Sequence, residues 1–289
     1  MIDDEAVVTY SDIHHPRIKS KELELEGGRF YKIQLDYASK GLDPQVQLMW
    51  AFLDTDYLTE ALETAVKAEV IIAALGLSPG LEGEEMPVDV EGFFGGDRTD
   101  ISLPSPQETL LKELHALGKP IILVLLNGSA LAINWAAEHV PAILEAWYPG
   151  QSGGDALADV IFGDFNPAGR LPVTFYRSID DLPPFEAYSM ENRTYRYFSG
   201  EPLYAFGHGL SYTTFNYDNL HIDQGEVQVG GKVHISVDVT NCGSRAGDEV
   251  VQLYTHYNGT HITHPVKELK GFQRITLEPN EAKTVTFHL

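Results

Sequence analysis

The chain has 289 residues, and its 42 acidic against 20 basic side chains give a formal net charge of −22. A chain this acidic repels nucleic-acid phosphates and anionic lipid, and we therefore expect no nucleic-acid and no membrane partner. Its charge does not exclude uncharged sugars or peptides as ligands. A single cysteine, Cys242, excludes an internal disulfide framework and a multi-cysteine metal site, and no apolar run approaches the roughly 18 residues of a membrane helix.

Residues 1–52 have the pattern of an all-β segment. Apolar and polar residues alternate with period two over Arg29–Tyr37, and a turn at Lys40–Pro44 leads into a second run at Val46–Trp50. So few strands do not form an independent sheet domain, and we expect this segment to be the end of a β module. The acidic first residues lack the apolar core of a signal peptide.

Residues 53–205 are predicted to form an α/β sandwich domain. Helical periodicity alternates with short, continuous apolar runs of the kind found in buried parallel strands. The expected helices cover Asp56 (as the cap) to about Lys67, about Ser105 to Leu117, about 130–139 and 155–162, and the expected strands cover Val70–Leu75, Pro120–Leu126, 142–147 and Leu171–Phe175. This alternation predicts a mostly parallel sheet with helices on both faces.

Residues 206–289 return to an all-β pattern and are predicted to form an immunoglobulin-like sandwich from about residue 214. The runs Val233–Val239, Glu249–Tyr254 and Lys283–His288 alternate with period two between turn-forming residues. About five strands are visible where about seven are usual, so the sandwich is expected to be incomplete. Cys242 lies in a strand-like stretch and is interpreted as a small buried hydrophobe.

The segment Gly150–Gly154 fits the G-x-S-x-G pattern of a nucleophile elbow, with Ser152 at its centre. Two interpretations compete: Ser152 is the nucleophile of an esterase, or the glycines serve a tight turn of the backbone. An elbow requires an acid and a histidine on later βα units, yet the chain becomes all-β after one further strand. We therefore favour the turn, and we expect His208, in a glycine-rich stretch, to be structural.

The long irregular segment Gly76–Thr99 leaves the carboxyl end of a predicted parallel strand, where open α/β sheets place their ligand crevices. Loops of this length inside a compact domain are usually functional or disordered. A solvated acidic loop is the simpler interpretation, but Met86, Phe93 and Phe94 are costly to leave in water. Its charged residues are Glu82, Glu84, Glu85, Asp89, Glu91, Asp97 and Arg98.

Segments from about residue 60 to the end, in the right order, resemble glycoside hydrolase family 3, the β-xylosidases and β-glucosidases. They are Gly76–Thr99 with Leu103, Pro104 and Gln107 after it, Gly118–Gly128, Ala146–Gly154, Phe162–Pro172, Tyr195–Phe198, Phe206–Thr213, Gly247–Tyr254 and Lys267–Phe272. The form of the loop is closer to that of β-xylosidase-type members. The resemblance implies that residues 206–289 are fibronectin type III-like and that residues 1–52, above all 20–52, are the end of a PA14 domain.

The resemblance implies a retaining, exo-acting β-glycosidase that works with two carboxyl groups. Glu84 matches the acid/base glutamate of the family, with Glu82 and Glu85 as alternatives, and Asp97 and Arg98 are expected to pair and anchor the loop. The nucleophile would be an aspartate on a (β/α)8 barrel upstream, and nothing in this chain matches its motif. The chain alone is therefore expected to be inactive.

The expected partners are that barrel domain and a β-xyloside, β-glucoside or oligosaccharide substrate, with no cofactor and no metal. The resemblance makes the full-length protein a secreted or periplasmic one. A non-catalytic fragment that binds carbohydrate or serves as a scaffold is the competing interpretation. Trp147 and Tyr148 have the character to stack on a sugar ring, although packing in the core is the favoured role for both.

Overall fold

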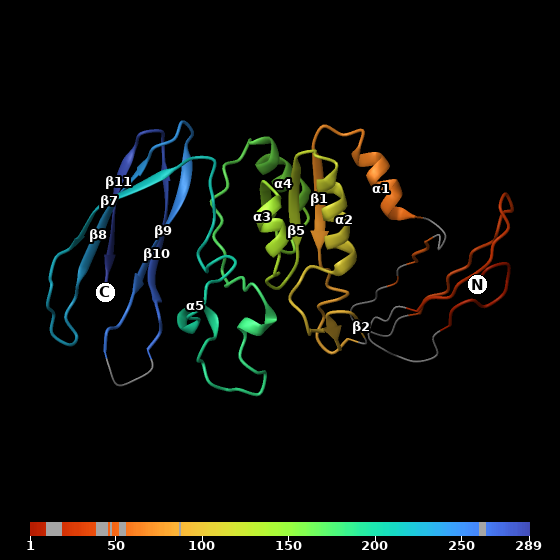
Figure 1. Ribbon diagram of the computed structural model, residues 1–289, viewed down its shortest axis with the longest axis horizontal. Coiled ribbons are helices and arrows are strands. Elements are labelled where there is room, and N and C mark those ends of the chain that lie inside the picture. The colour runs from red at the N-terminus through yellow and green to blue at the C-terminus, as the bar shows by residue number, and fades with distance from the viewer. Residues whose placement is uncertain (10–18, 39–45, 47, 52–55, 87, 260–263) are drawn as a thin grey trace. The chain divides into compact units, whose positions relative to one another are not determined.

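The computed structural model describes residues 1–9, 19–38, 46, 48–51, 56–86, 88–259 and 264–289. The chain divides into two compact units, Met1–Thr59 and Glu60–Leu289. Figure 1 shows the course of the chain and the labels of its helices and strands.

The first unit does not form the strands that its alternating pattern predicts. Its described residues make isolated bridges, between Ile2 and Glu5 and between Ile2 and Ile33, and no regular strand. Phe30 is 98% exposed, so the apolar side of the expected strand has no layer against which to pack. A ribbon without such a layer is marginal in water, which is why the period-two pattern is not sufficient here. The expected turn Lys40–Pro44 lies outside the described residues, and the assignment to a PA14 domain stays a prediction.

Three parallel strands lie at the centre of the second unit, as the sequence predicts. In spatial order they are β1 (Ile71–Gly76), β5 (Ile121–Leu126) and β6 (Ala142–Glu145). β5 is the middle strand, and its continuous apolar run is buried because both faces of the sheet are covered there. Gly76 pairs with Leu126, and Leu125 pairs with Glu145, so the carboxyl ends of all three strands meet at one edge.

The helices α1 (Tyr57–Ala65), α2 (Ser105–Ala116), α3 (Asn134–His139) and α4 (Gly153–Phe162) lie close to their predicted positions. The short 3-10 helix η1 (Ile179–Asp181) and α5 (Thr194–Tyr197) follow them and were not predicted. Asp56 caps α1 as predicted, because Thr59 N and Thr59 Oγ1 donate to its carboxylate at 3.1 and 2.6 Å. α2 lies alongside β1 and buries Leu111 and Leu114 in the core of the sheet (Figure 1).

The end of β1 is fixed in place before the long loop begins. Gln107 of α2 donates from Nε2 to Gly76 O and accepts from Gly76 N, both at 2.7 Å. Gly76 has φ +134°, and a Cβ there would lie 2.1 Å from Leu126 O, so this position requires glycine. The loop therefore starts from a rigid point at the edge of the sheet.

The loop itself contains regular structure that the sequence analysis did not predict. Three two-residue strands form an antiparallel meander: β2 (Asp89–Val90), β3 (Phe93–Phe94) and β4 (Asp97–Arg98). Phe93 is 6% exposed and packs into the core cluster of the sheet, as the cost of leaving it in water predicts, whereas Phe94 is 73% exposed, contrary to the same expectation.

The expected strand Leu171–Phe175 is wrong. Its regular pairing is reduced to one bridge, between Phe175 and Tyr204, and Leu171 instead exchanges backbone hydrogen bonds with Gly207 and His208. Pro172 has no N–H to donate to a strand ladder, which explains why an apolar run at this place does not join the sheet.

The last part of the chain is a two-sheet β sandwich of five strands, as predicted. The strands are β7 (Phe215–Ile222), β8 (His234–Asn241), β9 (Gly247–Thr255), β10 (Glu268–Leu277) and β11 (Ala282–His288), in the sheets β11-β8-β7 and β10-β9. Val239, Val251 and Leu277 form the centre of its core. Cys242 is exposed, contrary to expectation, because β8 ends one residue before it.

Polar contacts join the α/β part to the sandwich within the second unit. Arg170 Nη2 donates to both carboxylate oxygens of Glu249 at 2.9 and 2.8 Å, and the two side chains are 12% and 10% exposed. Asn166 Nδ2 donates to Ala246 O at 2.9 Å, and Arg245 donates to Gly163 O. The loops on both sides are thus held together by one half-buried ion pair and by exposed hydrogen bonds around it.

Candidate functional site

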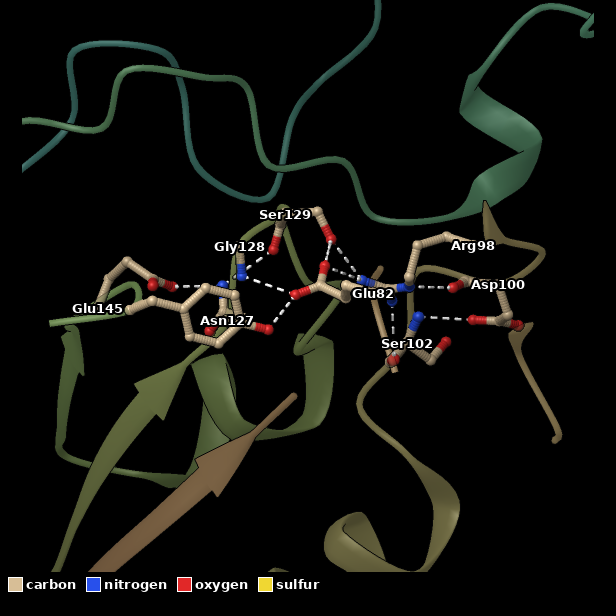
Figure 2. A network of polar contacts seen from close by, with 9 residues as sticks. Glu82, Arg98, Asp100, Ser102, Asn127, Gly128, Ser129 and Glu145 are labelled. Atoms are coloured by element: carbon tan, nitrogen blue, oxygen red, sulfur yellow. Dashed lines mark hydrogen bonds and ion pairs between the residues drawn. The ribbon is translucent and has the colours of Figure 1, made fainter. Parts of the chain in front are cut away.

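Glu82 lies at the centre of a polar network at the carboxyl edge of the parallel sheet (Figure 2). A tight turn places it there, because Glu82 N donates to Ser78 O at 3.1 Å. Its side chain is 10% exposed. Gly128 N donates to Oε2 at 2.8 Å, the Ser129 hydroxyl donates to Oε1, and the Tyr148 hydroxyl donates to Oε2.

These bonds decide the protonation state of Glu82. Burial alone would raise its pKa, but the bonds from Ser129, Tyr148 and Gly128, together with the charge of Arg98, outweigh burial and lower the pKa below its ordinary value. Tyr148 stays a donor because burial and the adjacent Glu82 carboxylate raise the pKa of its hydroxyl. Glu82 is therefore an ionised acceptor that ties the loop to the turn after β5.

Arg98 joins the same network from β4. Its Nη1 lies 3.9 Å from Glu82 Oε1 and donates to Ser129 Oγ at 2.8 Å, while Nε donates to Asp100 O at 2.8 Å and Nη2 to Ser102 O at 3.2 Å. The expected ion pair with Asp97 is wrong, since the carboxylate beside Arg98 is that of Glu82. Successive side chains of a strand point to opposite faces, and Asp97 is exposed on the other side.

Glu84 and Glu85 lie at the tip of the loop and are exposed. Within the described part of the chain, neither carboxylate takes part in a hydrogen bond or ion pair. The tip is nevertheless fixed at its base, because the backbone of Gly83 is enclosed: a Cβ on Gly83 would lie 1.8 Å from Met86 Sδ, and one on Gly96 would lie 1.6 Å from Gly83 O. Glu85 has a positive φ of 51°, which turns the chain back toward the meander.

Glu145 and Asn127 are site residues that the sequence analysis missed. Glu145 is the last residue of β6, and its carboxylate accepts from Trp147 N at 3.1 Å and from Asn127 Nδ2 at 3.3 Å. Burial, against which the bonds from Trp147 and Asn127 act, raises the pKa of Glu145 to about 7, and the nearby charge of Glu82 adds to the rise. Asn127 directly follows the predicted strand Pro120–Leu126, and Glu145 lies near the end of the predicted strand 142–147, so the rule that parallel strands end at one edge would have brought both to the site.

Glu145 makes the stability of the chain depend on pH. A folded-state pKa of about 7 against an ordinary value of 4.5 means that the folded chain keeps a proton that the unfolded chain has lost. The free energy of unfolding should therefore fall as the pH rises from about 4.5 to about 7, by about 3 kcal/mol, and level off above that range. Urea unfolding of the wild type and of Glu145→Gln over this pH range measures the effect. Subtracting one free energy of unfolding from the other cancels the contributions of all other titrating groups. Parallel curves would contradict the expectation.

A depression of about 570 Å³ opens beside the network. It is lined by Gly128, Ser129, Ala130, Trp147, Pro172 and Val173. Trp147 has a positive φ of 54°, and its ring packs edge-to-face against buried Phe175, with centroids 6.0 Å apart. Trp147 thus combines the core packing that we favoured with a surface that faces the depression, whereas Tyr148, for which core packing was also favoured, is 39% exposed and donates to Glu82.

The serine of the G-x-S-x-G segment does not have the surroundings of a nucleophile. Ser152 directly precedes α4, and the structure joins its hydroxyl to no histidine among the described residues. A Cβ on Gly153 would lie 2.5 Å from Pro149 Cβ, so glycine serves close approach of the backbone there. His208 stacks on Tyr204, with ring centroids 5.2 Å apart, and burial lowers its pKa.

In the described ranges, no group of three or more His, Cys, Asp or Glu side chains is arranged to hold a metal ion. None of the helices formed by the described residues has both the length and the apolar character to cross a membrane.

Known proteins resemble this chain in sequence and in fold. The domain described as "Glycosyl hydrolase family 3 C-terminal domain" matches residues 8–212, and a "Fibronectin type III-like domain" matches residues 249–289. A xylan 1,4-beta-xylosidase of Xylanibacter ruminicola is 45% identical over 94% of this chain and 30% of its own length. A periplasmic beta-glucosidase of Salmonella typhimurium is 41% identical over 80% of this chain and 30% of its own length.

Solved structures agree with the sequences. A b-glucosidase from Erythrobacter marinus superimposes with a TM-score of 0.70 at 40% identity, over 80% of this chain and 31% of that chain. A beta-glucosidase from Kluyveromyces marxianus in complex with glucose gives a TM-score of 0.69 at 34% identity. The chain spans about 30% of the length of the curated relatives named above. By its sequence and its fold, the chain belongs to glycoside hydrolase family 3, and residues 8–212 are the part that matches the C-terminal domain of that family.

Proposed function

We propose that this chain supplies the acid/base residue, Glu84, to a retaining, exo-acting β-glycosidase that cleaves β-xylosides or β-glucosides. The nucleophile belongs to a (β/α)8 barrel in another part of the protein. Family membership and relatives named as β-xylosidases and β-glucosidases support the reaction class. The division of labour agrees with a chain that spans about 30% of the length of those relatives.

The observation that carries the assignment is the contrast between Glu82 and Glu84. A general acid must hold a proton at the working pH and must reach the glycosidic oxygen. Glu82 accepts from three donors beside Arg98 and has a lowered pKa, so it is suited to anchoring and not to proton donation. Glu84 is two residues further on, exposed and without such partners.

The expected chemistry follows from this placement. Glu84 donates its proton to the oxygen of the departing group while the barrel carboxylate forms a bond to the anomeric carbon. The resulting carboxylate then takes a proton from water, which hydrolyses the covalent intermediate. A retaining mechanism needs the two carboxyl groups about 5–5.5 Å apart, one on each side of the bond that breaks. Glu85 is the alternative, on the same exposed tip.

A comparison of this chain with the complete protein tests the proposal. We expect the complete protein to hydrolyse an aryl β-xyloside or β-glucoside with retained configuration at the anomeric carbon, which NMR of the released sugar measures. We expect the purified 289-residue chain to be inactive. Hydrolysis by the chain alone, abolished by a substitution within it, would contradict the division of labour. A complete protein that binds oligosaccharides without cleaving them would favour the non-catalytic alternative.

A further inference from the structure

Two histidines lie directly opposite each other in the sandwich sheet, in which β11, β8 and β7 lie side by side (Figure 1). His234 of β8 pairs with His288 of β11. The adjacent pair, Val233 and Leu289, exchanges both backbone hydrogen bonds at 2.9 and 3.0 Å, so the histidines form a non-hydrogen-bonded pair. Side chains of such pairs approach more closely than those of hydrogen-bonded pairs. The register therefore brings two imidazoles together at one end of the sheet.

Both imidazoles point away from the core. The residues next to them, Ile235 and Phe287, are each 8% exposed and point inward, and successive side chains of a strand alternate between the two faces. The ring centroids of His234 and His288 are 4.6 Å apart, with the planes at 81°. Two imidazoles that bind one tetrahedral zinc ion through nitrogens at about 2.0–2.1 Å have centroids about 5 Å apart. The spacing fits one shared ion, and exposed side chains rotate freely enough to aim both nitrogens at it.

Asp223 holds His234 in one orientation. Asp223 N donates to His234 O at 3.1 Å, and His234 N donates to Asp223 Oδ1 at 2.9 Å. The other carboxylate oxygen, Oδ2, lies 3.3 Å from His234 Nδ1. A carboxylate on Nδ1 favours the tautomer that carries its proton there and leaves the lone pair of Nε2 free. Histidines that bind metal ions in proteins commonly have such a carboxylate on the other ring nitrogen.

A depression of about 420 Å³ lies at the histidine pair and leaves room for an ion with bound water. It is lined by Lys232, His234, His288 and Leu289. Lys232 brings a positive charge to this surface, but its long stem allows the ammonium group to stay in water. The net charge of −22 attracts cations to the chain as a whole.

A second pair of histidines, at the ends of α2 and α3, has different surroundings. The rings of His115 and His139 have centroids 5.7 Å apart, and the indole of Trp135 contacts both, at 5.3 and 4.6 Å. His139 Nδ1 also lies 2.8 Å from Trp135 O. Packing on the indole accounts for the closeness of these two rings. His139 is therefore a suitable control for the pair in the sandwich.

We propose that His234 and His288 bind one divalent transition-metal ion of the class of Zn²⁺, Ni²⁺ and Cu²⁺, and that Asp223 positions His234 for it. Imidazole nitrogen suits these ions, whereas Mg²⁺ and Ca²⁺ prefer oxygen ligands. Two histidines leave the remaining positions to water, so the site differs from the groups of three or more side chains that the described ranges lack. The ion joins β8 to β11 and stabilises the sandwich, independently of the proposed function.

Titration calorimetry with Zn²⁺ on the purified chain and on the complete protein tests the proposal. His288→Ala should lower the affinity for Zn²⁺ at least tenfold, because one of two ligands is lost. Asp223→Asn keeps both ligands and should lower it about tenfold, because the carboxylate no longer orients His234. His139→Ala, the control, should bind Zn²⁺ like the wild type, and a tenfold excess of Mg²⁺ should not displace Zn²⁺.

Thermal unfolding gives a second readout of the same site. An ion that binds the folded chain raises its Tm, so Zn²⁺ should raise the Tm of the wild type and of His139→Ala more than that of His288→Ala. The Tm of each variant without metal shows whether it folds, and His288→Gln replaces His288→Ala if the latter does not. Equal affinities of wild type and His288→Ala would overturn the proposal. So would a loss of binding in His139→Ala, or binding by the chain that the complete protein lacks.

Discussion

Replacing Glu84 with alanine in the complete enzyme is expected to lower the hydrolysis of alkyl glycosides and oligosaccharides by a factor on the order of 10² to 10⁴. An alkoxide is a poor leaving group, so its departure needs a proton in the transition state. A phenol of low pKa leaves without much help, and the first step with an activated aryl glycoside should be slowed far less. Steady-state rates on a series of leaving groups measure this difference.

The second half of the reaction gives an independent reading of the same variant. With an activated aryl glycoside, the covalent intermediate should form and then accumulate, because Glu84 also serves as the base that activates water. Azide needs no base, so it should restore turnover and give a glycosyl azide of retained configuration.

The neighbouring carboxylates provide the comparison for the assignment. Glu85→Ala leaves the loop anchored and should alter only the field around the acid, whereas Glu82→Ala disturbs the loop. If Glu84→Ala kept normal rates on an alkyl glycoside while Glu85→Ala lost them, the acid/base role would pass to Glu85.

Replacing Glu82 with alanine should destabilise this chain by about 3 kcal/mol, because it removes one member of a mostly buried charge pair. Arg98, 13% exposed, would lose its carboxylate partner, and Gly128 N would lose an acceptor. Urea unfolding followed by far-UV circular dichroism measures the change, and the isosteric Glu82→Gln should also be destabilised, since an amide places a donor among donors.

Glu84→Ala in the same chain is the matched control for stability. Its side chain is exposed and without partners in the described ranges, so the change should stay within about 0.5 kcal/mol. A loss of stability in Glu84→Ala as large as that in Glu82→Ala would contradict the separation of an anchoring glutamate from a presented one.

The sequence was sufficient for the features that depend on local pattern. Continuous apolar runs predict β1 and β5, because a parallel strand buried on both faces is apolar along its whole length. Asp56 predicts the start of α1, because the backbone N–H that its side chain caps belongs to Thr59, only three residues away. The alternation over Arg29–Tyr37 is an equally local pattern, but the strand that it predicts does not form. A strand also needs a layer against which to pack, and the pattern alone does not provide one.

Local sequence patterns could not predict which residues contact Glu82. Gly128, Ser129 and Tyr148 are 46, 47 and 66 residues away in sequence, and they meet Glu82 because three strands end at one edge. For Arg98 adjacency in sequence was misleading, since Asp97 is its neighbour along the chain but lies on the opposite face of β4. The candidate acid, Glu84, was found from resemblance, and the structure adds the contrast with Glu82.

The ion pair of Arg170 and Glu249, in which one guanidinium nitrogen contacts both carboxylate oxygens, has a consequence for how the molecule unfolds. Separating the α/β part from the sandwich would break this ion pair, whose side chains are 12% and 10% exposed, and would leave Glu249 with its hydrogen bond to Tyr217 alone. Asn166 would lose its bond to Ala246 in the same event. The type of fold thus changes near residue 214, but we expect the parts on the two sides to unfold together. Heat or denaturant should therefore unfold both parts in one transition. A fragment that ends at residue 205 would keep Arg170 but lack its partner Glu249.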